Sequence, residues 1–312
     1  MALDIVVCFY LLGLFAGLVR SDLRLPASLY DTLTLLLLLT IGLKGGVELS
    51  RHSIDGFGWQ VLALVGLGAI LALMAFQILL RFGRFDRNDA ACIGAHYGSV
   101  SVGTFAVAIA FLDHTGILYE PHAAVFVVIM EMPAIAIGIL LARGLCKKTQ
   151  WGVLAHEVFL NKGMLLMGGG LLIGATMGDT GTKSIHPLFF ESFKGVLALF
   201  LLEMGLVTAE RMGDLKKCGL FLLGFGVGMP LLGAVCGAFT GHWLGLSVGG
   251  VALLATLAAS ASYIAVPAAM RIAVPQARHG IAIAVSLGVT FPFNVAIGIP
   301  LYLQLARQVT AL

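Results

Sequence analysis

The sequence predicts an all-α integral membrane protein of ten transmembrane helices, arranged as two inverted repeats of five. Three observations predict this class. Apolar residues make up 59% of the 312-residue chain and charged residues only 11%, whereas soluble domains carry about 25% charged residues. Small polar residues interrupt two apolar stretches, at 98–104 and 260–267. Ser99 and Ser262 lie 163 residues apart, and so do Gly42 and Gly205. A membrane chain built twice over, with a broken helix in each copy, is typical of a secondary transporter.

Ten apolar segments follow one another along the chain. A bilayer core requires about 20 residues per helix, and spans 1 and 6, which are equivalent members of the two halves, are the short ones. Because five is an odd number, the second half enters the membrane from the opposite side, so the repeats are inverted. The interruptions fall in spans 4 and 9. The predicted spans are 4–19, 30–44, 58–81, 88–112, 121–142, 162–177, 188–207, 218–240, 247–270 and 279–306.

The predicted organisation has three parts. Residues 1–142 form the first repeat, 143–161 a cytoplasmic connector, and 162–312 the second repeat. Within the connector, residues 151–160 are predicted to form a short interfacial helix with Trp151 at headgroup level. A plain connecting segment is the alternative interpretation.

The distribution of loop charges tests the span count independently. The connections after odd-numbered spans hold 14 Lys and Arg residues, and the opposite side, including both termini, holds 5. This bias places the odd-numbered loops in the cytoplasm and both termini outside, as expected for a multi-pass protein of the inner membrane. The apolar N-terminus lacks a basic start and a small-residue cleavage site, so we expect the first helix to be retained.

Several function classes are excluded by what the sequence lacks. The net charge of +3 is scattered, which does not indicate nucleic-acid binding. The five cysteines are dispersed, with neither metal spacing nor a disulfide framework. Motifs of hydrolases and of phosphate-binding loops are absent. We therefore expect neither an enzyme nor a covalent cofactor, and no energy supply from ATP on this chain.

The two interruptions predict an anion site near the membrane midplane. A helix that restarts after a break presents unpaired N–H groups and the positive end of its dipole. Two inverted copies direct two such ends at one point, where serine and threonine hydroxyls add donors. The alternative is that these hydroxyls only bond between packed helices. The predicted substrate-binding residues are Gly98, Ser99, Val100, Ser101, Ser260, Ala261, Ser262 and Tyr263.

Glu131, about ten residues into span 5, predicts a cation site. A carboxylate at this depth is costly and normally faces a partner, a cavity or an ion. A sodium site would combine it with the neutral oxygens of Thr104, Thr290 and Asn294. The alternatives are that Glu131 carries a proton, or that it accepts a hydrogen bond from a neighbouring serine. Sodium is thus the expected coupling ion.

Other polar residues have less specific interpretations. We expect Glu203, the other intramembrane acid, to pair with Lys44 or to face a subunit interface. We expect His96 to be a satisfied packing residue and Arg271 to be a topology anchor, with anion attraction as its alternative. The outer-loop cluster is expected to be solvated rather than metal-binding; its members are Asp113, His114, Glu120 and His122.

The interruption motifs resemble those of the sodium-dependent bicarbonate transporters first recognised in cyanobacteria. The resemblance runs from residues 40–46 to 297–303, and its most specific pieces are 98–104, 130–133, 204–206 and 259–267. It implies a homotrimer in which spans 3–5 and 8–10 form a core that moves elevator-fashion past a gate of spans 1, 2, 6 and 7. It also implies a small PII-like cytoplasmic regulator.

The resemblance also carries residue roles and marks departures. Ser99, Ser101, Ser260 and Ser262 fall where the family contacts bicarbonate and sodium, and Glu131 stands where cyanobacterial members carry an aspartate. Tyr263 replaces an aspartate of that motif and would narrow the cavity. Val207 replaces another acid of the family, and the long hydrophilic insert between the halves is absent.

The expected function is sodium-coupled symport of a small anion, most simply bicarbonate, across a lipid membrane. One alternative is a transporter of another monocarboxylate or organic anion in the same fold, coupled to protons through Glu131. Another is a passive anion channel. A third, an intramembrane enzyme or sensor, lacks the catalytic residues it would need.

Overall fold

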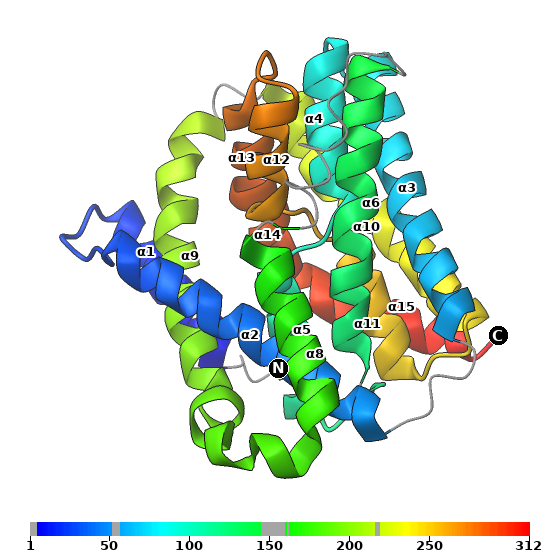
Figure 1. Ribbon diagram of the computed structural model, residues 1–312. Coiled ribbons are helices and arrows are strands. Elements are labelled where there is room, and N and C mark those ends of the chain that lie inside the picture. The colour runs from blue at the N-terminus through cyan, green and yellow to red at the C-terminus, as the bar shows by residue number, and fades with distance from the viewer. Residues whose placement is uncertain (1–4, 52–56, 121, 145–159, 161, 216–218) are drawn as a thin grey trace.

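The computed structural model describes residues 5–51, 57–120, 122–144, 160, 162–215 and 219–312, and these residues are mostly helical, with no strand among them (Figure 1). Six of the helical segments are long and apolar enough to cross a membrane: Ala27–Arg51, Gly58–Arg81, Arg87–Thr115, Ala123–Arg143, Gly219–Trp243 and His279–Thr310. Ile5–Leu18 and Val248–Ala258 are shorter apolar helices. The expectation of an all-α membrane protein is confirmed, whereas the count of ten spans stays a prediction.

The first group of helices consists of two closely packed pairs. Helix α1 (Ile5–Leu18) packs on α9 (Phe193–Leu215), and α2 (Ala27–Arg51) packs on α8 (Lys162–Thr182). Glycines permit both contacts, because a side chain at Gly205 would collide with the backbone of Tyr10, and one at Gly42 with the backbone of Met167. In membranes small residues of this kind let helix backbones approach closely. Two short helical turns, η1 (Lys183–Ile185) and η2 (Pro187–Glu191), join α8 to α9.

The second group contains the remaining helices, and its two halves show matching contacts. Helix α3 (Phe57–Arg81) packs on α4 (Arg87–Gly98) and α6 (Ala123–Arg143). In the other half, α10 (Gly219–Trp243) packs on α11 (Val248–Ala258) and α15 (Ile299–Thr310). Helix α5 (Val102–Thr115) continues after α4, and α12 (Ala265–Ala273) continues after α11. In Figure 1, α1 and α9 lie on the left, apart from α3, α6 and α10 on the right.

The last predicted span is one helical path with two wider turns. It runs through α13 (His279–Val285), a π-helical turn η3 (Ser286–Thr290), α14 (Phe291–Phe293), a second π-helical turn η4 (Asn294–Gly298) and α15. Such π turns frequently mark functional positions. They contain Thr290 and Asn294, two of the residues that the sequence predicts to bind sodium.

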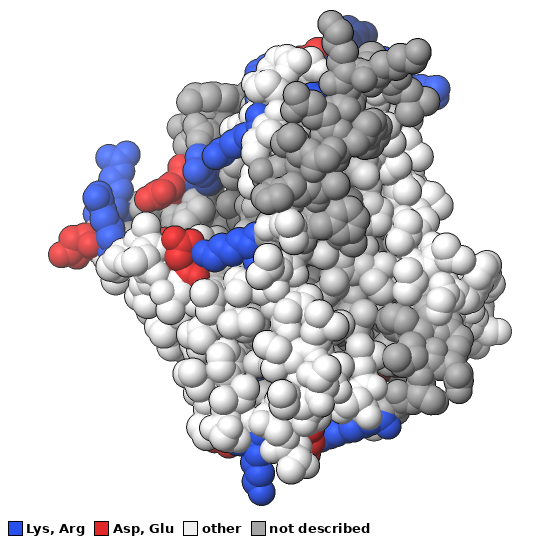
Figure 2. Space-filling view, viewed as in Figure 1, with Lys and Arg blue, Asp and Glu red and all other residues white. Residues whose placement is uncertain are grey.

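The face of the molecule shown in Figure 2 is largely uncharged where residues are described. On the face shown in Figure 2, most charged side chains gather toward the upper left and the bottom, and a broad uncharged surface lies between them. Large apolar side chains such as Phe15, Leu62 and Leu172 are exposed on the helices. Lipid-facing helices have this character, because lipid chains solvate apolar side chains. The predicted interfacial helix at 151–160 lies, apart from residue 160, outside the described residues.

Candidate functional site

Two helix breaks lie at the positions that the sequence predicts. Helix α4 ends at Gly98 and α5 begins at Val102, while α11 ends at Ala258 and α12 begins at Ala265. We call the two interruptions, residues 99–101 and 259–264, the crossing, because they bond to each other. The N-terminal ends of α5 and α12 and the C-terminal ends of α4 and α11 therefore come together. Helix N-termini favour anions, and C-terminal carbonyls favour cations.

Local chemistry explains where the first break begins and ends. Gly98 lies so close to α3 that a Cβ there would come within 2.5 Å of the Ala72 Cβ and within 2.8 Å of the Gly68 carbonyl oxygen. After the break, Ser101 caps α5: its Oγ accepts hydrogen bonds from the Thr104 N–H at 3.1 Å and the Thr104 hydroxyl at 2.9 Å. Serine is a favoured N-cap because its oxygen satisfies a free N–H of the first turn.

Direct hydrogen bonds join the two breaks. The Ser262 N–H donates to the His96 carbonyl oxygen at 2.9 Å, and His96 Nδ1 lies 2.6 Å from the Ser262 carbonyl oxygen. Because a carbonyl only accepts, Nδ1 carries the proton and donates. The Ser101 N–H donates to the Ser260 hydroxyl at 2.8 Å, which in turn donates to the Leu257 carbonyl oxygen. Residues from opposite halves of the chain thus fix one another.

Glu131 and Asn294, which are also 163 residues apart, each contact the break of their own half. The Ser99 hydroxyl donates to the backbone carbonyl oxygen of Glu131 at 3.3 Å. The Asn294 amide donates to the Ala259 carbonyl oxygen at 2.9 Å, and its Oδ1 accepts a bond from the Tyr302 hydroxyl at 2.7 Å. The alternative interpretation of Glu131 as a serine acceptor thus applies to its backbone and not to its side chain.

Three buried polar atoms from residues of the crossing and its immediate neighbours have no hydrogen-bond partner among the described residues. They are His96 Nε2, Glu131 Oε2 and the Tyr263 hydroxyl. An unpaired buried polar group costs about 1–3 kcal/mol, and native structures contain few of them. The expectation that His96 is a satisfied packing residue holds for its bonded Nδ1 but not for Nε2, and its partner Ser262, 166 residues away, could not be predicted. The place of His96 directly before Tyr97 and Gly98 was the only signal.

Aromatic rings cover the crossing on the side of the first helix group. The Tyr263 hydroxyl and the Phe200 ring both lie against Gly103, where a Cβ would come within 3.0 Å of Phe200. Tyr263 packs edge-on against Phe291 at 5.7 Å between ring centroids, and Phe291 packs in the same way against Tyr10 of α1. The expectation that Tyr263 narrows the cavity stays a prediction.

The structure brings together some of the predicted site residues and not others. Ser99, Ser101, Ser260 and Ser262 are each at most 3% exposed, so the crossing is closed to solvent. Hydroxyls of the first three bond to protein groups. Three of the predicted sodium ligands, Thr104, Thr290 and Asn294, use their side chains in hydrogen bonds to other protein groups, and the sodium site itself stays a prediction. Thr104 bonds to Ser101.

Thr290 belongs to a separate hydrogen-bond network. Its Oγ1 lies 2.6 Å from the Tyr97 hydroxyl and donates to the Gly226 carbonyl oxygen at 2.7 Å. It therefore joins α4 to α10. Asn294 bonds to Ala259 and Tyr302 in a similar way. The side chains of Thr290 and Asn294 therefore stabilise the packing around the interrupted helices.

An ion pair anchors the start of α4. The Arg278 guanidinium and backbone N–H both donate to the buried Asp89 carboxylate, the backbone bond measuring 2.7 Å. Asp86 caps the same helix by accepting N–H bonds from Asn88 and Asp89 at 3.0 Å. The bond from the Asp89 N–H is the main cause that lowers the pKa of Asp86. These contacts fix α4, and hence the first break, to the loop before α13.

Lys44 and Glu203 do not pair, contrary to one expectation. The Lys44 ammonium lies 4.2 Å from the centre of the Phe193 ring, in a cavity with Asp113. Glu203 lines a different cavity of about 390 Å³ with Arg20 and Arg24. Lys44 packs at Phe193, the first residue of α9, whereas Glu203 lies ten residues further along that helix. The alternative for Glu203, a subunit interface, stays a prediction.

The outer-loop acids have structural partners. Glu120 accepts bonds from the N–H and hydroxyl of Ser247, at 2.5 and 3.2 Å, at the start of α11. Asp113 accepts a bond from the Tyr119 hydroxyl at 3.1 Å. Within the described part of the chain, no three His, Cys, Asp or Glu side chains are placed to hold a metal ion.

Apolar helices that span the bilayer, and two interrupted helices that bond across the halves of the chain, define a multi-pass all-α membrane protein. A comparison with protein families then identifies its family. The chain belongs to the Na⁺-dependent bicarbonate transporter superfamily, whose model matches residues 5–307. Membership makes it a transporter rather than an enzyme, and implies bicarbonate and sodium as transported species. A comparison with curated proteins found no match.

Proposed function

We propose that this protein is a secondary active transporter that couples the uptake of bicarbonate to sodium across the inner membrane. The observation that carries the proposal is the crossing itself. Four helix ends meet there, next to three unpaired polar atoms, in a chain of the Na⁺-dependent bicarbonate transporter family. A small ion with both donors and acceptors satisfies these atoms, whereas a packed apolar interior does not.

The helix ends divide the binding chemistry between anion and cation. The N-termini of α5 and α12 and the Tyr263 hydroxyl supply donors for the oxygens of bicarbonate. The Glu131 carboxylate, next to Ser99, supplies a charged oxygen for sodium. Thr104, Thr290 and Asn294 can join Glu131 as sodium ligands only by giving up their present hydrogen-bond partners. We therefore assign Glu131 as the main sodium ligand. One carboxylate balances one sodium ion.

Transport requires that the closed crossing open to each side in turn. We propose that the second helix group moves as an elevator core past the first group, which acts as the gate and forms a homotrimer. The aromatic contacts among Tyr10, Phe291 and Tyr263 lie at this boundary and break when the groups slide. The matching contacts of the two halves support the inverted repeat. Both termini would face outside, and a PII-like protein would regulate from the cytoplasm.

Uptake into proteoliposomes tests this proposal. We expect radiolabelled bicarbonate to accumulate only with an inward sodium gradient, and unlabelled bicarbonate to compete better than acetate. Bicarbonate uptake that does not respond to sodium would contradict the coupling.

One rival transporter function is supported by a specific observation. Glu131 Oε2 has no described partner, so a proton can neutralise the carboxylate in place of sodium. Tyr263, which replaces an aspartate of the family motif, would also change which anion the pocket accepts. Accumulation of acetate driven by a proton gradient would favour that rival. A passive channel is disfavoured because the crossing is closed to solvent; flux without any ion coupling would support it.

A further inference from the structure

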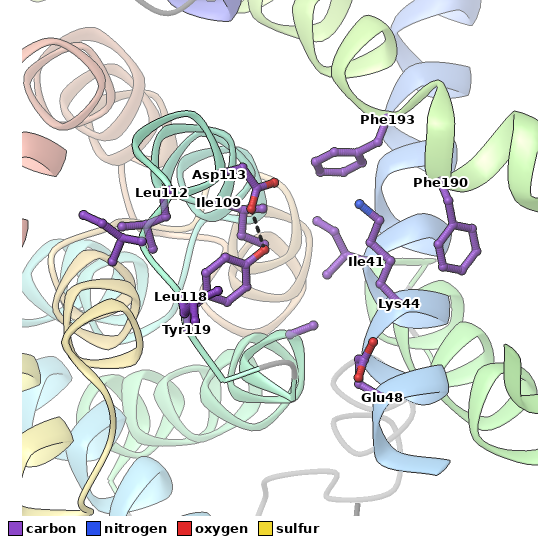
Figure 3. A pocket seen from close by; sticks show the side chains of 13 residues that line it. Ile41, Lys44, Glu48, Ile109, Leu112, Asp113, Leu118, Tyr119, Phe190 and Phe193 are labelled. Atoms are coloured by element: carbon purple, nitrogen blue, oxygen red, sulfur yellow. Dashed lines mark hydrogen bonds between the residues drawn. The ribbon is translucent and has the colours of Figure 1, made fainter. Parts of the chain in front are cut away.

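A cavity of about 500 Å³ lies between the two helix groups, well away from the crossing (Figure 3). Small-molecule sites typically have volumes of about 300–1,000 Å³. Ile41, Lys44 and Glu48 line it from α2, Asp113 from α5, and Phe193 from α9. The topology predicted from the loop charges places this end of α5 on the outer side. Twelve residues of α5 separate Asp113 from Ser101, a path of about 18 Å at 1.5 Å per residue.

The Lys44 ammonium forms no contact ion pair among the described residues, although the Asp113 carboxylate of the same cavity acts on it electrostatically. It lies over the Phe193 ring, 4.2 Å from its centre, and points into the cavity in Figure 3. The two acids have other contacts. Glu48 accepts a bond from Arg51 at 2.8 Å, and Asp113 accepts one from the Tyr119 hydroxyl at 3.1 Å.

We propose that this cavity is a second, outer anion site, in which Lys44 holds bicarbonate or a similar small carboxylate-like anion before it reaches the crossing. The inference rests on the proposed transport function and adds an entry site to it. Charge in a cleft raises the local concentration of an oppositely charged substrate. Lys44 attracts the anion, and Asp113 opposes it from across the cavity. These opposite effects give the site a distinctive signature.

The test measures initial rates of uptake from the outer side as a function of bicarbonate concentration at saturating sodium. Lys44→Gln should raise KM about threefold to tenfold with little change in kcat, since steering acts on encounter. Asp113→Asn should lower KM, because it removes a repelling charge and keeps an oxygen for Tyr119. Lys44→Arg should retain the wild-type KM. Lys183→Gln, which removes an exposed lysine of η1 outside the cavity, is the matched control and should change nothing.

Salt and sidedness sharpen the test. An impermeant salt should shrink the difference between Lys44→Gln and wild type, because it screens the charge. Uptake from the cytoplasmic side should not respond to Lys44→Gln.

Two results would overturn the inference. One is that Lys44→Gln and Asp113→Asn shift KM in the same direction. The other is that Lys44→Gln lowers kcat with KM unchanged, as expected of a purely structural lysine. In both cases the wild type still shows sodium-driven uptake, so the proposed function survives. If the wild type itself takes up no bicarbonate, the proposed function fails instead.

Discussion

His96 and Ser262 bond to each other twice, through the Ser262 N–H to the His96 carbonyl at 2.9 Å and through His96 Nδ1 to the Ser262 carbonyl at 2.6 Å. The pair joins the end of α4 in one half of the chain to the interruption after α11 in the other. Its geometry leaves His96 Nε2 buried without a described partner. His96 is thus a positioning residue for the second break. Its Nε2, which has no described partner, belongs to the same imidazole ring that bonds to that break.

Replacing His96 separates the positioning bond from the free nitrogen. His96→Ala should destabilise the protein by about 1–3 kcal/mol, because the Ser262 carbonyl loses its side-chain donor. His96→Asn, whose amide N–H replaces Nδ1, should recover part of that loss. Thermal unfolding in detergent measures both effects.

A transport assay on the same variants adds a second readout. The KM for bicarbonate should rise in His96→Ala more than in His96→Asn. Equal stability of wild type and His96→Ala would contradict the positioning role.

Gly103 provides space for Tyr263 and Phe200. Gly103→Ala should cost about 1–3 kcal/mol through overpacking, because the added methyl meets the Tyr263 hydroxyl and the Phe200 ring. Gly168→Ala is the matched control, since a Cβ there meets nothing within 4 Å.

Removing the Tyr263 hydroxyl should rescue Gly103→Ala. The double variant Gly103→Ala with Tyr263→Phe should be more stable than Gly103→Ala alone, as thermal unfolding can show. Tyr263→Phe by itself should destabilise the protein little, because its hydroxyl lies near Ser101 without a well-formed hydrogen bond among the described residues, but it should weaken bicarbonate binding. Lower stability of Tyr263→Phe would show that the hydroxyl is bonded.

Glu131→Gln tests the coupling ion. The amide keeps the size of the side chain and the backbone carbonyl that Ser99 contacts, so folding should be retained. Loss of the charged oxygen should weaken sodium binding, and the sodium concentration for half-maximal uptake should rise at least tenfold. Sodium-dependent uptake identical to wild type would remove Glu131 from the sodium site.

Arg278→Gln tests the anchor of α4. Among the described residues it leaves the buried Asp89 carboxylate with the Arg278 backbone N–H as its remaining donor. Breaking a buried charge pair costs about 3–5 kcal/mol, and because Arg278 is 59% exposed we expect about 1–3 kcal/mol. Arg307→Gln, at an exposed arginine near the C-terminus, is the control. Thermal unfolding that is the same for both variants would contradict the anchoring role.

The positions of the helix breaks were predictable because glycine, serine and proline have strong local preferences. Gly98 allows a close approach to α3, Ser101 caps α5, and both effects act within a few residues. The matched spacing of Ser99 and Ser262 added the expectation that the breaks meet. The local sequence was therefore sufficient to predict the all-α membrane class and the location of the crossing.

The side-chain partners were not predictable, because they come from distant parts of the chain. Thr290 bonds to Tyr97 and Gly226, which lie 193 and 64 residues away, and the sodium set proposed from residue type alone did not account for them. The role of His96 depends on Ser262 in the same way. The expected pairing of Lys44 with Glu203 failed because Lys44 packs against Phe193 at the start of α9, while Glu203 lines a different cavity.

Equilibrium binding of radiolabelled bicarbonate to the purified protein, measured across a range of sodium concentrations, tests anion binding at the crossing most directly. We expect wild type to show a saturable component of bicarbonate binding whose affinity rises with sodium. This sodium-dependent component should be lost in Ser262→Val, a variant checked for folding by size-exclusion chromatography. Binding that is indifferent to sodium and unchanged in folded Ser262→Val would contradict an anion site between the two interruptions.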